Sequence, residues 1–437
     1  MKILVIGNGG REHALIRTLR RTNAAAGQLQ IFCAPGNDGI AVDAQCVSLN
    51  ATDVAALVQF ALETKIDLTI VGGETALAAG IVDAFEQRGL MIAGASKAAA
   101  RLESSKAFAK DFMTRHNVPT ARYRLAHSVE EAQRILRSGE FGAGDAPVVV
   151  KADGLAAGKG VTVANSRHEA EQAAIELRPT SAASVVGASS APAPCIVIEE
   201  ALAGREASLL VFADGLDYRL MPTARDHKRV GEADTGPNTG GMGAITTHGI
   251  LDEGTLARVR REIIEPTLEG ARAEGFPFHG ILFVGLMLTS EGTRVLEYNV
   301  RFGDPEAQAI LVRLESNLID VFEAMARGKL RDASVRWSDE ASAAVVLAAR
   351  GYPAKPETGA RIVGLNEAAQ MPDVEIFHAG TKRAANGDWV AAGGRVLNVV
   401  SRAATLDQAL ARCYAAIDKI HWDGMHYRRD IGRFAGR

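Results

Sequence analysis

Two clusters of polar residues carry most of the chemistry that this sequence suggests. The first, residues 151–160, joins two lysines to three glycines: Lys151, Gly154, Gly158, Lys159 and Gly160. Backbone amides in such a run can approach an anion closely, and lysine adds point charge. The spacing is not that of a P-loop, and a strand rather than a helix follows. The run predicts a phosphate-binding loop, and the alternative is a flexible hairpin with solvated lysines.

The second cluster lies on a predicted strand that ends near residue 299. Alternate residues of a strand share a face, so Glu297, Asn299 and Arg301 should point one way. Two oxygen ligands beside a cation suit Mg²⁺ and a phosphoryl group. The alternative is a solvent face with a surface ion pair. The apolar residues on the other face, and the apolar neighbour at residues 282–288, favour a buried site.

Three further segments could bind ligands. Residues 195–206 form a strand, a turn and a second strand that could present backbone groups to an adenine and Glu206 to a ribose, although an acidic turn explains them equally well. Residues 226–243 form a long loop dense in glycine and charge; such loops are usually functional, and the alternative is a disordered excursion. Residues 7–12 lack the third glycine of a dinucleotide fingerprint, so they predict a small phosphate held by loop amides and Arg11, or else a simple tight turn.

Strands and helices alternate in the first part of the chain, which predicts a doubly wound α/β domain over residues 1–104. We expect its strands at residues 2–6, 30–34, 68–71 and 91–93, with helices at 13–21 and 76–88. Later elements are expected as a helix at 105–117, a hairpin of 147–151 with 161–164, and strands at 195–199, 206–212, 282–289 and 294–299. The last hundred residues read as a separate α/β cap with strands near 342–349, 374–379 and 394–401 and a helix at 405–420.

Composition narrows the class of protein. The net charge of −3 gives no support for a nucleic-acid partner. The four cysteines show no CxxC or Cys/His spacing, so neither a disulfide framework nor a zinc site is predicted. No apolar run reaches the roughly 18 residues of a membrane helix. We therefore expect a cytoplasmic enzyme.

Taken together, these motifs resemble the phosphoribosylamine–glycine ligase family, ATP-grasp enzymes of purine biosynthesis. The matching stretches follow the family order over nearly the whole chain: residues 5–13, 105–112, 150–160, 226–243, 297–306, 380–382 and 421–423. The strings at 226–229 and 234–243 are specific to this ligase, whereas the phosphate loop alone indicates only ATP-grasp. The alternatives are another ATP-grasp purine-pathway ligase or carboxylase, and a catalytically dead nucleotide sensor.

The resemblance implies a fold and a set of site residues. The fold is α/β with an α+β core: an N-terminal doubly wound domain (1–104), a two-lobed ATP-grasp domain (105–320) with a mobile lid at about 122–193, and a small C-terminal cap (321–437). Mg²⁺ or Mn²⁺ would be held by Glu297 and Asn299, while Arg301 and Lys151 would act in catalysis. The implied ATP-binding residues are Lys106, Lys151, Gly154, Gly158, Lys159, Gly160, Glu199, Glu200, Leu202 and Glu206.

The implied substrates are glycine and 5-phosphoribosylamine, and the product would form through glycyl phosphate. Candidate substrate-binding residues are Gly9, Gly10, Arg11, Glu74, Asp226, Lys228, Asn238, Gly240, Gly241, Lys382 and Arg395. The chain departs from the family pattern at residues 72–76, where two prolines are lost, and at 179–194, which are rich in Ala, Ser and Pro. We expect a monomer that resembles the monofunctional bacterial form.

Overall fold

The computed structural model describes residues 1–23, 29–142, 146–155, 160–177 and 195–433. The predicted N-terminal α/β arrangement is confirmed. Its five strands form an all-parallel sheet in the order β3-β2-β1-β4-β5. They are β1 (Lys2–Gly7), β2 (Gln30–Pro35), β3 (Gln45–Cys46), β4 (Leu68–Val71) and β5 (Ile92–Ala93).

Helices connect these strands. They are α1 (Gly10–Thr22), α2 (Val54–Thr64), α3 (Glu74–Ala79) and α4 (Ile81–Glu86), with α5 (Arg101–Ser104) and α6 (Lys106–Arg115) leading out of the domain. The single helix expected at 76–88 is wrong: Gly80 adopts φ +88° and divides it into α3 and α4. A left-handed residue cannot continue an α-helix, and glycine adopts this conformation without steric cost.

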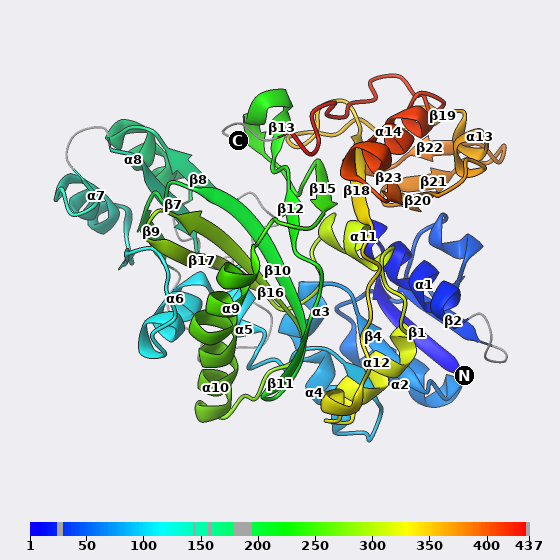
Figure 1. The fold of residues 1–437 in the computed structure, drawn as a ribbon, viewed down its shortest axis with the longest axis horizontal. Helices are drawn as coiled ribbons and strands as arrows, with labels where there is room; N and C mark the ends of the chain where they lie inside the picture. The colour runs from blue at the N-terminus through cyan, green and yellow to red at the C-terminus, as the bar shows by residue number, and fades with distance from the viewer. Residues whose placement is uncertain (24–28, 143–145, 156–159, 178–194, 434–437) are drawn as a thin grey trace.

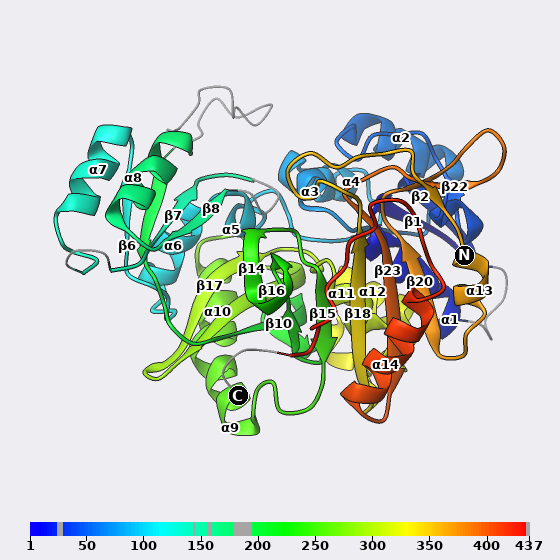
Figure 2. The ribbon, with the colours of Figure 1, turned by 90° about the horizontal axis from the view of Figure 1, so that it is seen from above.

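The next part of the chain contributes a small sheet at one end of the molecule (Figures 1 and 2). It has the order β6-β9-β7-β8 and carries α7 (Val129–Arg137) and α8 (Arg167–Glu176). Its strands are β6 (Tyr123–Ala126), β7 (Val148–Ala152), β8 (Val161–Ala164) and β9 (Ile196–Glu200). The predicted pairing of 147–151 with 161–164 is confirmed as the antiparallel pair β7–β8.

A large sheet forms the centre of the molecule. Among the described residues it has nine strands in the order β17-β16-β10-β12-β15-β18-β23-β20, with β11 attached to β10. The strands are β10 (Arg205–Asp214), β11 (Asp217–Leu220), β12 (Ala224–Asp226), β15 (Gly243–Thr246), β16 (His279–Thr289), β17 (Gly292–Asn299), β18 (Ala341–Ala348), β20 (Val374–His378) and β23 (Arg395–Ala403). The expected C-terminal strands exist, but they are not separate: β18 pairs with β15, so they continue this sheet.

The remaining elements cover or extend the central sheet. The helices are α9 (Glu253–Val259), α10 (Glu265–Ala273), α11 (Glu306–Leu311), α12 (Leu318–Ala326), α13 (Leu365–Ala369) and α14 (Leu406–Ile417). Two small sheets pair β13 (Arg229–Gly231) with β14 (Thr235–Asn238), and β19 (Arg361–Ile362) with β22 (Trp389–Ala391) and β21 (Thr381–Arg383). The expected loop at 226–243 therefore contains a short hairpin. No helix in the described parts of the chain is long and apolar enough to cross a bilayer.

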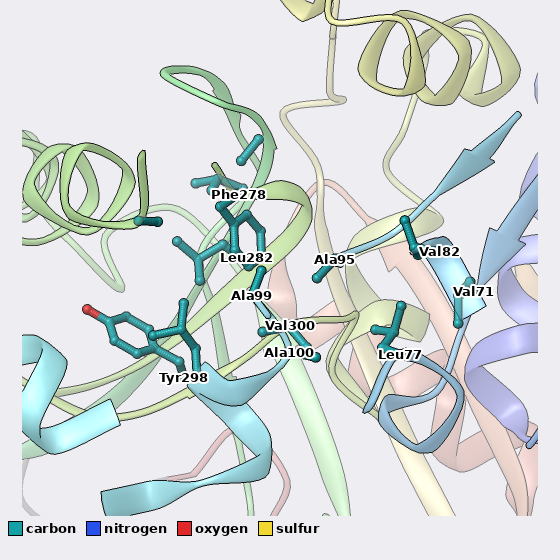
Figure 3. Close-up of a cluster of buried hydrophobic side chains, with 14 of the residues drawn as sticks. Val71, Leu77, Val82, Ala95, Ala99, Ala100, Phe278, Leu282, Tyr298 and Val300 are labelled. Atoms are coloured by element: carbon teal, nitrogen blue, oxygen red, sulfur yellow. The ribbon is translucent and has the colours of Figure 1, made fainter. Parts of the chain in front are cut away.

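One hydrophobic core joins the N-terminal domain to the central sheet. Val71, Leu77 and Val82 belong to the same buried cluster as Tyr298 and Val300. Figure 3 shows Ala95 lying between these two groups, with Ala99 and Ala100 beside Val300. Because buried apolar contacts are close-packed, this core fixes the distance between the N-terminal domain and the end of β17. Ligand-binding side chains on the N-terminal domain and at the end of β17 can therefore be held at a fixed separation.

Candidate active site

The face of β17 that the sequence singled out is built as expected. Tyr298, Val300 and Phe302 are buried, whereas Glu297, Asn299 and Arg301 are only partly buried and share the opposite face. The Arg301 guanidinium donates to Asn299 Oδ1 at 3.1 Å. Residue pairing with β16 shifts just before Glu297, so that Leu296 is an extra residue. Such a bulge turns the strand locally and re-aims the side chains that follow it.

The lysines expected at the phosphates lie near the same face. Lys106, the first residue of α6, donates to Gly154 O at 2.8 Å. Asp153 ties the start of the glycine run to α6, since it accepts the Ala107 amide at 3.2 Å. Burial lowers the pKa of Lys106, Glu297 opposes that effect, and Lys151 adds to it. The structure thus brings Lys106, Lys151 and Glu297 within electrostatic reach of one another, whereas Gly158 and Lys159 lie outside the described residues.

Lys151 ends in a buried ionic cluster that the sequence did not predict. Its Nζ lies 2.8 Å from Glu199 Oε1, and Lys110 Nζ lies 3.0 Å from Glu199 Oε2. The Lys110 and Glu199 side chains are 3% and 2% exposed. Thr120 links the cluster to β17, since it accepts from Lys110 at 2.8 Å and donates to Val295 O at 2.7 Å. The Glu199 carboxylate is therefore committed to two lysines rather than directed at an adenine.

The other residues expected around the nucleoside are also paired. Glu200 accepts from the Arg122 amide at 2.9 Å and from its side chain at 2.7 Å. Glu206 accepts from Lys228 at 2.7 Å, and Leu202 lies half-buried in the connection between β9 and β10. Because these carboxylates already hold cations, adenine recognition here would fall to the backbone and to the Leu202 side chain. The Glu206–Lys228 pair is partly exposed, so a ribose hydroxyl could reach it.

Arg301 is the point at which several candidate residues meet. Its guanidinium contacts Glu74 Oε2 at 3.0 Å, Glu103 Oε1 at 2.7 Å and Phe302 O at 3.1 Å. Arg11 donates to the same Phe302 carbonyl at 3.0 Å. Burial acts to raise the pKa of Glu74, but Arg301 and Arg11 lower it to about 2. The predicted Arg11, Glu74 and Arg301 therefore form one group, to which the structure adds Glu103.

The start of α1 differs from its expected role. The Gly9 amide donates to Glu12 Oε2 at 2.6 Å, and Glu12 also accepts from Arg11 at 2.7 Å. A side chain at Gly72 would collide with Glu12, whose carboxylate carbon and oxygen would lie within 2.7 Å of the added Cβ. The buried Glu12 thus caps the helix and fills the loop. Because Glu12 holds the Gly9 amide, a phosphate at this loop would have to displace Glu12 or use other groups, and the assignment of Gly9 stays a prediction.

Arg395 joins the loop at 226–243 to the segment that follows β17. Arg395 donates to Gly240 O and to Asp304 O, each at 2.6 Å, and pairs with Asp304 Oδ2 at 3.0 Å. Gly241 has φ +107°, and a Cβ there would lie 2.4 Å from Pro305 Cδ. Both the conformation and the space require glycine. The predicted Gly240, Gly241 and Arg395 are therefore brought together, with Asp304 as an unpredicted partner.

The remaining candidates for substrate binding, from this loop and from elsewhere in the chain, have different surroundings. Burial raises the pKa of Asp226 to about 6; Lys228 opposes this change, whereas Glu206 and Glu297 add to it. Asn238 lies in β14 opposite Arg229, and Gly10 packs at the start of α1 against Asn398. Lys382 is exposed on β21, in the small sheet with β22. Among the described residues, no hydrogen bond or ion pair joins Lys382 to the Arg301 group, so its assignment stays a prediction.

The donor set is suited to a divalent cation held jointly with phosphate. Glu297 and Asn299 offer a carboxylate and an amide oxygen on one partly buried face, beside lysines that could hold the phosphates. Mg²⁺ is typically bound by one or two such protein oxygens, the remaining ligands being water and phosphate. Among the described residues, no group of three or more His, Cys, Asp or Glu side chains forms a metal cage. The residues therefore fit a metal that arrives with a nucleotide.

Comparison with known proteins assigns the family. Residues 1–103, 104–307 and 342–434 match the N domain, the ATP-grasp (A) domain and the C domain of phosphoribosylglycinamide synthetase. A phosphoribosylamine–glycine ligase of Mesorhizobium japonicum is 47% identical over 434 residues, covering 99% of this chain and 98% of that protein. The crystal structure of the Thermotoga maritima phosphoribosylamine–glycine ligase is 30% identical, with a TM-score of 0.81, and covers 98% of this chain and 100% of that one.

A more distant likeness shows the fold alone. Biotin carboxylase from Campylobacter jejuni, solved as an ATP-analogue complex, has 17% identity and a TM-score of 0.70, covering 97% of this chain and 92% of that one. Motifs, site geometry and full-length similarity point the same way. The chain belongs to the phosphoribosylglycinamide synthetase family, whose central domain has the ATP-grasp fold.

Proposed function

We propose that this chain ligates glycine to 5-phosphoribosylamine at the expense of ATP, giving glycinamide ribonucleotide, ADP and phosphate in de novo purine biosynthesis. The observation that carries the proposal is the group around Arg301. It draws Glu74 and Arg11 from the N-terminal domain and Asn299 from β17. Asp304, which pairs with Arg395, lies within electrostatic reach of Arg11, and Arg395 also holds Gly240. Asn299, a proposed metal ligand, and Arg11, a proposed ligand of the sugar phosphate, thus both lie beside Arg301.

The chemistry follows from the weakness of a carboxylate as an acyl donor. Glycine must first be phosphorylated, and the resulting glycyl phosphate is then open to attack by the amine of phosphoribosylamine. In this scheme Lys106 and Lys151 hold the ATP phosphates, and Arg301 stabilises the charge that develops on the transferred phosphoryl group. Mg²⁺ or Mn²⁺, held by Glu297 and Asn299, would offset negative charge on the phosphoryl oxygens.

The protein must also keep water from the acyl phosphate. We propose that residues 122–193 act as a lid over ATP, because the described part of this range belongs to a sheet of its own at one end of the molecule. The domain boundaries at 104 and 320, a monomeric state and a cytoplasmic location belong to the same proposal. The continuity of β15 with β18 supports a C-terminal segment that moves with the central sheet rather than with the lid.

Product analysis tests the function directly. Purified protein should release ADP from ATP and Mg²⁺ only when both glycine and phosphoribosylamine are present, and glycinamide ribonucleotide should appear in equal amount. Replacing glycine by bicarbonate or formate separates the ligase from an ATP-grasp carboxylase or formyl transferase. Absence of glycine-dependent ADP release would overturn the proposal.

A further inference from the structure

Arg301 is held by more acceptors than its expected role requires. Two of them are neighbours in the sequence, Asn299 Oδ1 at 3.1 Å and Phe302 O at 3.1 Å. The third is Glu74 Oε2 at 3.0 Å, from a residue already predicted to bind substrate. The fourth and closest is Glu103 Oε1, at 2.7 Å from Nη2. Glu103 lies nearly two hundred residues earlier in the chain, so the tertiary fold alone brings it here.

Glu103 holds the backbone as well as the side chain. Its second oxygen, Oε2, accepts the amide of Val300 at 2.8 Å. One carboxylate therefore contacts the guanidinium of Arg301 and the backbone amide of the residue before it. Two contacts to adjacent groups fix the angle at which the side chain leaves the strand, which a single contact to the guanidinium could not do.

The element that carries Glu103 is itself anchored. Leu102 is buried on α5, and Ala99 and Ala100 precede it in the core cluster that includes Val300. Figure 3 shows Ala99 and Ala100 lying beside Val300. Because α5 packs against the end of β17, Glu103 has a fixed base from which to hold Arg301.

The two carboxylates around Arg301 differ in their surroundings. Glu74 is 25% exposed, whereas Glu103 is 7% exposed. Burial raises the pKa of Glu103 to about 7, although Arg301 opposes that change, and Arg301 and Arg11 lower the pKa of Glu74 to about 2. Glu74 can therefore exchange partners with an arriving substrate, while Glu103 is enclosed with its arginine.

We propose that Glu103 is a positioning residue for Arg301, which it holds against the end of β17 in the orientation needed for phosphoryl transfer. The inference rests on the proposed function, in which Arg301 stabilises the transferred phosphoryl group. It adds a residue of the N-terminal segment to that step. A misplacement of about 1 Å in such a group can cost on the order of 100-fold in rate.

Glu103→Gln tests the contact with little change of shape. One end of the amide can still accept the Val300 amide, but the other then presents N–H groups to a guanidinium that also has only donors. We expect kcat to fall about 10- to 100-fold, with the Kd for ATP within about twofold of wild type. Glu103→Asp keeps the charge and should retain more activity than Glu103→Gln. Glu274→Gln, which breaks an ion pair with Arg115 just after the C-terminal end of α10, is the matched control and should leave kcat unchanged.

A double-mutant cycle separates positioning from general damage. If Glu103 acts through Arg301, Glu103→Gln should add little to the loss caused by Arg301→Lys. Losses that multiply in the double variant, or a normal kcat in Glu103→Gln, would overturn the inference. If Glu103→Gln does not fold, Glu103→Asp carries the test, and a normal kcat in that variant overturns it equally.

A crystal structure of the Glu103 variant makes the test independent of the reaction. The Arg301 guanidinium should move from its place beside Asn299 and Phe302; an unmoved Arg301 contradicts the inference even if activity is lost. If the wild-type protein shows no glycine-dependent ADP release, the proposed function is wrong. The position of Arg301 in the Glu103 variant then still decides whether Glu103 positions Arg301.

Discussion

Arg428 offers a test of how the loop at 226–243 is held. The Arg428 side chain is fully buried and lies in the C-terminal segment that follows α14. It donates to Asp234 Oδ1 at 2.7 Å, to Asp430 at 2.8 and 2.7 Å, and to Arg229 O at 3.1 Å. Arg428→Met removes all of these hydrogen bonds but keeps a long side chain. We predict that it lowers the free energy of unfolding and makes the loop at 226–243 more mobile.

The magnitude follows from the exposure of the partners. Removing one member of a fully buried ion pair costs about 3–5 kcal/mol, because the other charge is left unpaired. Here Asp234 is 48% exposed and Asp430 is 19% exposed, so water can replace part of what is lost. We therefore expect a loss of about 2–3 kcal/mol, at or below the lower limit of that range.

Arg350→Met is the matched control. Arg350 pairs with Asp423 at 2.7 Å, but the two side chains are 51% and 86% exposed. Exposed ion pairs contribute about 0–1 kcal/mol to stability, so the free energy of unfolding of this variant in urea should be close to that of wild type. Amide hydrogen exchange should quicken at 226–243 in Arg428→Met and stay unchanged in Arg350→Met. Equal losses of stability in the two variants, or unchanged exchange in the loop, would refute the reasoning.

Three further predictions concern the site and its surroundings. Glu297→Ala should abolish turnover with the fold intact, since it removes the carboxylate expected to bind the metal; near-normal kcat with native circular dichroism would contradict the assignment. Gly241→Ala should raise the KM for phosphoribosylamine and lower the free energy of unfolding by roughly 1–3 kcal/mol, because φ +107° and the nearby Pro305 leave no place for a Cβ. Gly249 also has a positive φ, but no atom lies within 4 Å of a Cβ added there. Gly249→Ala therefore separates steric conflict from backbone strain. Burial lowers the pKa of Lys110 to about 8, although Glu199 opposes this change. The ordinary pKa of lysine is 10.5, so between pH 8 and pH 10.5 the unfolded chain binds more protons than the folded one. The free energy of unfolding of wild type relative to Lys110→Met should therefore rise across that window by up to about 3 kcal/mol, and a flat difference in urea titrations would contradict the dominance of burial over the pairing with Glu199.

Much of the architecture was accessible from local pattern. The strand at Leu68–Val71 was predicted to the residue, and the alternation at 297–302 gave the correct face for Glu297, Asn299 and Arg301. Such patterns are reliable because a strand with one buried face repeats every two residues. The break at Gly80 was missed, since a glycine within an apolar helical pattern does not reveal its own φ.

The pairing of charges was not accessible in the same way. Glu199 was expected at an adenine, yet its carboxylate lies between Lys110 and Lys151, which come from α6 and β7. Gly9 was expected to offer its amide to a phosphate, yet Glu12 takes it. In both cases a buried carboxylate must find a partner, and the sequence gives no measure of which groups burial will bring within reach.

The sequence by itself determined which residue types could do this chemistry and which strand would present them, because motif strings and strand periodicity are local properties. Only the tertiary structure decided how those residues are held. Glu103, Asp304 and Arg428 reach their partners across 90 to 200 positions of the chain. They do so because buried hydrophobic clusters hold the N-terminal domain and the C-terminal segment against one central sheet. Contacts of that kind depend on packing, which no local pattern records.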